Sequence, residues 1–232
     1  MSVFIWLWYN LSGDNMKRFL IIICLLLLVS GCGKNKENTD EVSDSFVLSK
    51  VDNDKDYIYT NDLNTYTLSD GSEYISKDIV INLNSNDADN ANMEIRSFIR
   101  KNNKDNSVTN GVLTSGCIYD YVYYVNDDYL SLVITYKYLR NGIYSDEESL
   151  VYVLSLTDGK KIDNKSLLDT FSLSEEEMFN KVEEAIESED SLYTIKSIKD
   201  NGYYLYVKDN KLIVLFYEIN DDESIKKELI LS

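Results

Sequence analysis

The chain alternates short apolar segments with polar turns along most of its length, and this pattern predicts more strand than helix. Residues 118–125 and 129–139 are rich in Tyr, Val, Ile and Leu, and residues 126–128 between them have the composition of a hairpin turn. This part of the chain is predicted to form an antiparallel β-hairpin. The other strands are predicted at 56–60, 65–68, 74–83, 150–156, 203–207, 211–219 and 225–231.

Two stretches depart from the strand pattern and carry apolar residues at helical spacing. The first runs from 85 to 101, and the second begins with Ser174 and Glu177, which form the sequence signature of a capping box, and ends near 187. One or two further helical turns are predicted at 166–171. Together the elements predict an α+β fold of antiparallel sheets with one main helix packed in each half. The helical side chains expected to be buried are Ile95, Phe98, Val182 and Ile186.

An apolar run near the start of the chain has a different character. Residues 19–29 are apolar, Lys17-Arg18 precede them and Val29-Ser30-Gly31-Cys32 follow. This order is typical of a signal peptide, and the last four residues resemble the lipobox of bacterial lipoproteins. We expect 1–32 to be that signal, with acyl chains such as palmitate on Cys32 holding the protein at the outer face of the cytoplasmic membrane in a Gram-positive envelope. The alternative is a buried apolar helix that ends in a Cys.

The segments before and after the signal pattern can also be distinguished. Residues 1–15 add nothing to the signal pattern, and we interpret them as an upstream extension before a start at Met16. Residues 33–45 are polar and charged without apolar periodicity, which predicts a flexible tether. The elements that follow form an N-terminal half, 46–157, and a C-terminal half, 158–232, and this length is sufficient for a hydrophobic core.

Acidic residues outnumber basic ones over the chain as a whole. The 232 residues carry 40 Asp and Glu against 23 Lys and Arg, a net charge of −17. Without residues 1–32, which hold Lys17, Arg18 and Asp14, 21 basic and 39 acidic residues remain and the net charge is −18. Phosphates would be repelled, so no nucleic acid is expected as a partner. The charge favours cations and basic proteins, although solubility alone is the other explanation.

The residue types exclude several kinds of catalytic and metal site. There is no His, so Ser-His-Asp and Cys-His catalysis and His-containing zinc sites are excluded. Cys117 is the one thiol after residues 1–32, and we expect it to be a small buried residue. Acids alternate from Asp52 to Asp56 as in an EF-hand loop, but Tyr57 and Leu63 occupy the Gly and Glu positions of that loop. We expect no metal ion, no cofactor and no catalytic residue; ligand-binding residues are not identified.

Ordered segments between residues 74 and 219 resemble one known family. They read VINLNSNDA (80–88), YVYYVNDDYLSLVI (121–134), LSLTDGKKI followed by SLL (154–168), and YYL followed by NKLIVLFYEI (203–219). In this order they are similar to the RsiV-like extracellular domain, which also stands in front of the catalytic domain of PdaC-type peptidoglycan deacetylases. The chain differs from that family at two loops, Asn141 to Tyr144 and Asn220 to Glu223.

The resemblance implies a binding role, because the RsiV anti-sigma factor binds lysozyme through this domain. We therefore expect a non-catalytic binding or sensing module for a basic protein such as lysozyme, or for a cell-wall component. The alternative is a carboxylate-based enzyme that acts on envelope glycan, since paired carboxylates can carry out glycoside hydrolysis.

The lipid anchor predicts a change in fractionation when Cys32 is replaced. Two acyl chains hold a protein stably on a bilayer, so the parent protein should sediment with membranes and Cys32→Ala should move to the soluble fraction. Immunoblots of both fractions after a high-salt wash measure this. Retention of Cys32→Ala on the membrane would contradict the lipoprotein interpretation.

Overall fold

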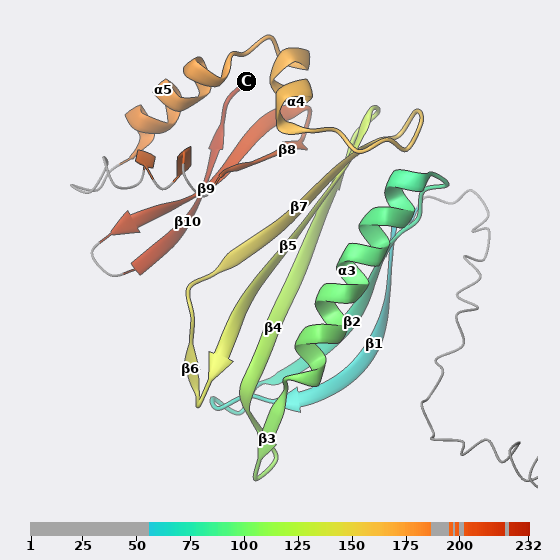
Figure 1. The fold of residues 1–232 in the computed structure, drawn as a ribbon, viewed down its shortest axis with the longest axis vertical. Helices are drawn as coiled ribbons and strands as arrows, with labels where there is room; N and C mark the ends of the chain where they lie inside the picture. The colour runs from blue at the N-terminus through green and yellow to red at the C-terminus, as the bar shows by residue number, and fades with distance from the viewer. Residues whose placement is uncertain (1–55, 187–194, 197, 200–201, 221–222) are drawn as a thin grey trace, which may run out of the picture. The chain divides into compact units, whose positions relative to one another are not determined.

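The computed structural model describes residues 56–186, 195–196, 198–199, 202–220 and 223–232, and its fold is α+β (Figure 1). A mixed seven-stranded sheet is followed by a three-stranded antiparallel sheet, with three helices. The predicted signal peptide, Cys32 and the tether lie outside the described residues. None of the helices in the described part is long and apolar enough to cross a membrane.

The elements follow one another in two groups. The first is β1 (Ile58–Thr67), β2 (Glu73–Ile81), α3 (Asn86–Lys104), β3 (Ser107–Thr109), β4 (Val112–Val125), β5 (Tyr129–Arg140), β6 (Ile143–Tyr144) and β7 (Glu148–Ser155). The second is α4 (Asn164–Thr170), α5 (Glu175–Ala185), β8 (Tyr204–Lys208), β9 (Lys211–Asn220) and β10 (Glu223–Ile230).

The predicted β4–β5 hairpin forms the centre of the large sheet. Its strands pair from Gly116 with Leu139 to Val125 with Leu130, and β7 pairs with the other edge of β5. The prediction of purely antiparallel sheets is wrong at one place, because β1 meets β4 in parallel through the pair Thr67 and Val112. The chain reverses at α3, at β3 and again at β4, so β4 runs in the same direction as β1.

The prediction divided β1 into two strands, whereas the structure has one. The residues between the two predicted segments, Asn61 to Asn64, are exposed, and the pairing with β2 shifts between Asp62 and Asn64. A solvent-facing strand with a bulge needs no apolar residues there, so the apolar pattern was interrupted. The very short strands β3 and β6 were not predicted, and every residue in both is exposed.

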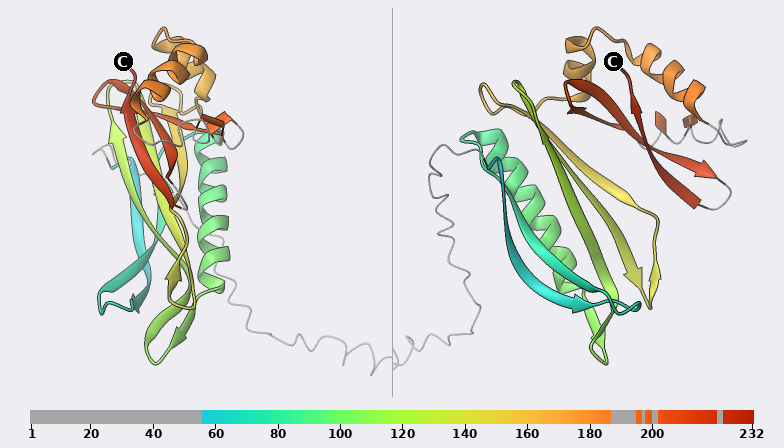
Figure 2. Two further views of the ribbon diagram at one scale, coloured as in Figure 1. Left: turned by 90° about the vertical axis from the view of Figure 1, so that its left-hand side faces the viewer. Right: turned by 180° about the vertical axis from the view of Figure 1, so that it is seen from behind.

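Helix α3 covers one face of the large sheet and packs on β2 and β4 (Figures 1 and 2). It begins at the predicted residue, because the Ser85 Oγ accepts the Ala88 N–H at 3.0 Å. The same hydroxyl donates to the Gly159 carbonyl at 2.6 Å, which ties the cap to the loop after β7. Gly159 has a φ of +68°, and a Cβ there would lie 2.5 Å from the Ser85 Cβ, so the site requires glycine.

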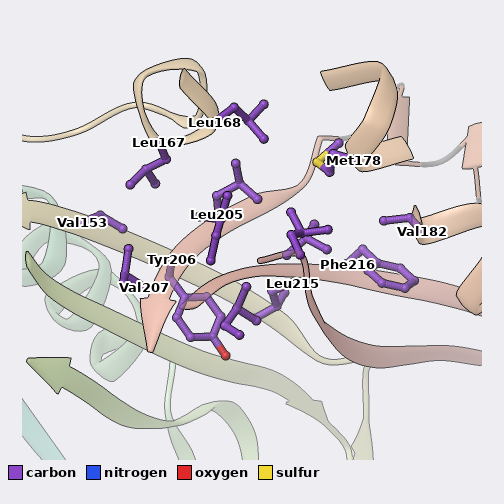
Figure 3. Packing of buried hydrophobic residues seen from close by; sticks show 14 of the residues in the cluster. Val153, Leu167, Leu168, Met178, Val182, Leu205, Tyr206, Val207, Leu215 and Phe216 are labelled. Atoms are coloured by element: carbon purple, nitrogen blue, oxygen red, sulfur yellow. The ribbon is translucent and has the colours of Figure 1, made fainter. Parts of the chain in front are cut away.

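The three-stranded sheet shares its hydrophobic core with β5 and β7, which contribute Val133 and Val153 (Figure 3). Helix α5 carries the predicted capping box between Ser174 and Glu177. Of the helical side chains expected to be buried, Ile95 and Val182 are fully buried, and Phe98 and Ile186 are partly buried. The two halves predicted from composition therefore share one core cluster.

The outer edge of β2 is closed partly by a side chain. The Ile81 N–H donates to the Asn92 Oδ1 at 2.7 Å, and the Asn92 Nδ2 donates to the Ile81 carbonyl at 2.9 Å. The carboxamide on α3 thus makes the two hydrogen bonds that a neighbouring strand would make. Both groups are buried, so their hydrogen bonds fix the helix to the strand.

Replacing Asn92 should therefore be costly. Asn92→Ala leaves a buried N–H and a buried carbonyl without partners, and we expect a loss of about 2–4 kcal/mol in the free energy of unfolding. Urea denaturation followed by circular dichroism measures it. The control is Asn90→Ala, an exposed position in the same helix, and an equal loss in both variants would contradict the pairing role.

Candidate binding groove

A hollow lies between β2 and β4. It has a volume of about 470 Å³, within the range of small-ligand pockets. We call it the β2–β4 groove. Its lining combines carboxylates, tyrosines and a few aliphatic side chains: Glu73, Tyr74, Ile75, Lys77, Ile118, Tyr119, Asp120, Tyr121, Thr135 and Glu147.

The groove exists because two strand edges face each other without pairing. Strand β4 pairs with β3 only as far as Ser115, and its other edge pairs with β5. The outward-facing main chain of β4 beyond Cys117 therefore lacks a neighbouring strand among the described residues. Within the described part of the chain β2 pairs with β1 alone, so its outer edge toward β4 also lacks a neighbouring strand.

Two tyrosine hydroxyls join these edges in place of a strand ladder. The Tyr119 hydroxyl donates to the Lys77 carbonyl at 2.8 Å and accepts the Lys77 N–H at 3.1 Å. The Tyr74 hydroxyl accepts the Tyr119 N–H at 3.2 Å. The two rings pack edge to face with centroids 6.1 Å apart, an arrangement that aromatic quadrupoles favour.

The same rings belong to a longer aromatic row. It runs through Tyr66, Tyr74, Tyr119, Phe98, Tyr136 and Tyr138, with neighbouring centroids between 4.8 and 6.1 Å apart. The row links the β1–β2 hairpin to β4, α3 and β5. Two of its rings, Tyr74 and Tyr119, line the groove, and their packing against the other rings holds them in place, as a binding site requires.

The groove carries a net negative charge. Glu73, Asp120 and Glu147 face one cation of the lining, Lys77. Glu147 is neutralised in part by Lys137 at 3.6 Å and Lys226 at 3.5 Å. Glu73, Asp120 and Lys77 have no ion pair among the residues that the structure describes. Two carboxylates and one ammonium are thus available to a ligand.

Burial keeps the tyrosine hydroxyls protonated. Desolvation raises the pKa of Tyr119 to about 12, and it raises the pKa of Tyr74 further above the ordinary value of 10.0. The pKa of one carboxyl group outside the groove is lowered instead. Hydrogen bonds from Lys160 and Ser155 lower the pKa of Asp158 to about 2. Asp158 lies in the turn after β7, so its shift has a structural cause.

The described part of the chain has no cluster of metal ligands and no reactive thiol. It contains no group of three or more Cys, Asp or Glu that could hold a metal ion. Cys117 is buried, as predicted, and burial raises the pKa of its thiol to about 12. At neutral pH this thiol is protonated and inaccessible, which excludes it as a nucleophile.

The sequence interpretation did not identify the groove. Its residues come from β2, β4, β5 and the loop before β7, and no spacing in the sequence connects them. Cys32, the one site residue that was predicted, lies outside the described residues. Of the two loops that differ from the resembling family, 141–144 forms the turn into β6, where Ile143 is 74% exposed, and 220–223 is only partly described.

No protein-family model and no curated protein matches the chain, so the likeness to the RsiV-like domain stays a prediction from the residues quoted above.

The tyrosine bridge predicts a loss of stability at alkaline pH. Tyrosine in the unfolded chain ionises near pH 10, whereas the pKa of Tyr119 in the folded protein is about 12. Its stabilising contribution is therefore complete below pH 10 and is lost as the pH rises toward 12. Tyr119→Phe should be less stable than the parent at pH 8 and should lose less stability between pH 8 and pH 11.

Urea midpoints at the two pH values measure this difference. Tyr123→Phe is the matched control, because Tyr123 is 37% exposed and makes no hydrogen bond with the described residues. Equal alkaline losses in the parent and in Tyr119→Phe would contradict the assigned role of Tyr119.

Proposed function

We propose that the protein is a lipid-anchored, extracytoplasmic binding module that captures a basic protein and performs no catalysis. The observation that carries the proposal is the β2–β4 groove, an open hollow with two carboxylates, Glu73 and Asp120, that have no ion pair among the described residues. A rigid hollow with unpaired negative charge attracts a positively charged surface. The predicted anchor at Cys32 would hold it at the membrane, where such a partner arrives from outside.

The charge of the chain supports the same conclusion. A net charge of −17 produces a negative field around the molecule that raises the rate of encounter with basic partners. The predicted resemblance to the RsiV-like domain names lysozyme as the first basic protein to test. A cell-wall component with amino groups would present the same positive charge.

The second candidate is a carboxylate-based enzyme acting on envelope glycan. Three carboxyl groups on one groove favour it, because glycosidases use such pairs. Glu147, however, already has two ion pairs, with Lys137 at 3.6 Å and Lys226 at 3.5 Å. It is therefore engaged within the protein, and we place binding first.

Surface plasmon resonance with the full chain captured in detergent tests the proposal. Lysozyme should bind, and its association rate should fall steeply as added salt shortens the Debye length from about 10 Å at 0.1 M. Lysozyme with its amines acetylated is the control and should bind far less. If the protein cleaves wall glycan and Glu73→Gln or Asp120→Asn abolishes the cleavage, the binding-module proposal is wrong and the enzyme proposal is supported.

A further inference from the structure

On the β4 side of the groove, the main-chain N–H groups already donate hydrogen bonds to side chains of the same protein. Alternate residues of β4 turn their main chain away from β5, and Tyr119 and Tyr121 are two of these. The Tyr119 N–H donates to the Tyr74 hydroxyl at 3.2 Å, and the Tyr121 N–H donates to the Asp120 Oδ1 at 2.8 Å. Opposite them, the Lys77 N–H donates to the Tyr119 hydroxyl.

The main-chain hydrogen-bond acceptors of the same β4 edge have no donor among the described residues. The carbonyl oxygens of Tyr119 and Tyr121 point to the same side as their N–H groups, and neither accepts a hydrogen bond from the described residues. The carboxylates of Glu73 and Asp120 add further acceptors. The main-chain N–H of Ile75, which also turns away from β1, is a remaining donor. Acceptors thus predominate on the walls.

An added strand does not suit such an edge. A strand presents donors and acceptors in alternation, and here the donors that it would need are already bonded to side chains. A ligand that only donates suits the edge much better. Arginine and lysine side chains donate without accepting, and arginine presents five N–H groups in a plane that also stacks on aromatic rings.

We propose that the β2–β4 groove receives one arginine side chain of the basic partner, with its guanidinium donating to the carboxylates of Glu73 and Asp120 and to the free main-chain carbonyls of β4. This inference rests on the proposed function and adds the group that is recognised. Lys77 is the competing cation, because it lines the groove and has no ion pair among the described residues. An arginine that enters must displace or repel it.

A small probe separates this pocket from the general acidity of the chain. The probe is acetyl-Gly-Arg-Gly-amide, with one positive charge, and its control has citrulline, a neutral side chain of nearly the same shape, in place of arginine. Both are titrated into the ¹⁵N-labelled full chain in detergent micelles and followed by NMR. Shifts should concentrate at β2 and β4 for the arginine peptide and be absent for the citrulline peptide.

Four variants test the residues. Asp120→Asn keeps the oxygen that accepts the Tyr121 N–H. Asp120→Asn and Glu73→Gln, each as a single variant, should weaken binding of the arginine peptide about five- to tenfold. Lys77→Gln should strengthen binding, because it removes the competing cation while the main-chain bonds of residue 77 remain. Glu183→Gln on α5 is the matched control: it removes the same charge at an exposed position outside the groove and should leave affinity nearly unchanged.

The outcomes distinguish this inference from the proposed function. If Glu183→Gln weakens binding as much as Asp120→Asn, or if the citrulline peptide binds equally, the arginine pocket is wrong. Lysozyme binding then tests the proposed function separately. The binding-module proposal holds if lysozyme still binds these variants in a salt-dependent way, and it is wrong if lysozyme does not bind the parent protein. A lysine peptide that binds more tightly than the arginine peptide would also overturn the assignment.

Discussion

The arrangement of the large sheet depends on side chains that replace a missing strand. The outer edge of β2 is held at Ile81 by the carboxamide of Asn92 and at Lys77 by the hydroxyl of Tyr119. A side chain satisfies one residue of an edge, whereas a strand satisfies every second residue. The β1–β2 hairpin is therefore attached at separate points, and the space between β2 and β4 remains open. The groove is a direct consequence of that way of closing an edge.

The C-terminal half contributes to the same arrangement, although it forms a separate sheet. Val133 and Val153 of the large sheet belong to the core of the small one, and the Val207 N–H donates to the Ser131 Oγ at 3.0 Å. Lys226 of β10 reaches Thr135 at 3.2 Å and Glu147 at 3.5 Å, and both of these residues line the groove. The boundary near residue 158 thus separates two topological units that share a core, and the second unit contacts two residues that line the groove.

The sequence predicts those parts of the fold whose cause is local. The hairpin of β4 and β5 has its own turn and apolar strands, and the cap at Ser85 and the capping box at Ser174 are read from neighbouring residues. The parallel contact of Thr67 with Val112 was missed, because the direction of β4 relative to β1 is set by three successive chain reversals. The groove was missed for a similar reason, since Lys77 and Tyr119 meet only when two unpaired edges lie side by side. The roles of Asn92 and Tyr119 follow from that meeting and from no motif.

Two different effects of negative charge operate in this molecule, and they act at different distances. The net charge of −17 acts over a Debye length and raises the encounter rate with any basic protein, so it gives little selectivity. In the proposed function the groove would act only at contact, where the unpaired acceptors on β4 favour a donor of matching geometry. An acidic surface without such a groove would serve solubility alone, as the charge by itself suggests. The internal satisfaction of the donors at Tyr119 and Tyr121 is the feature that solubility does not require, and for that reason our proposal places recognition at this part of the chain.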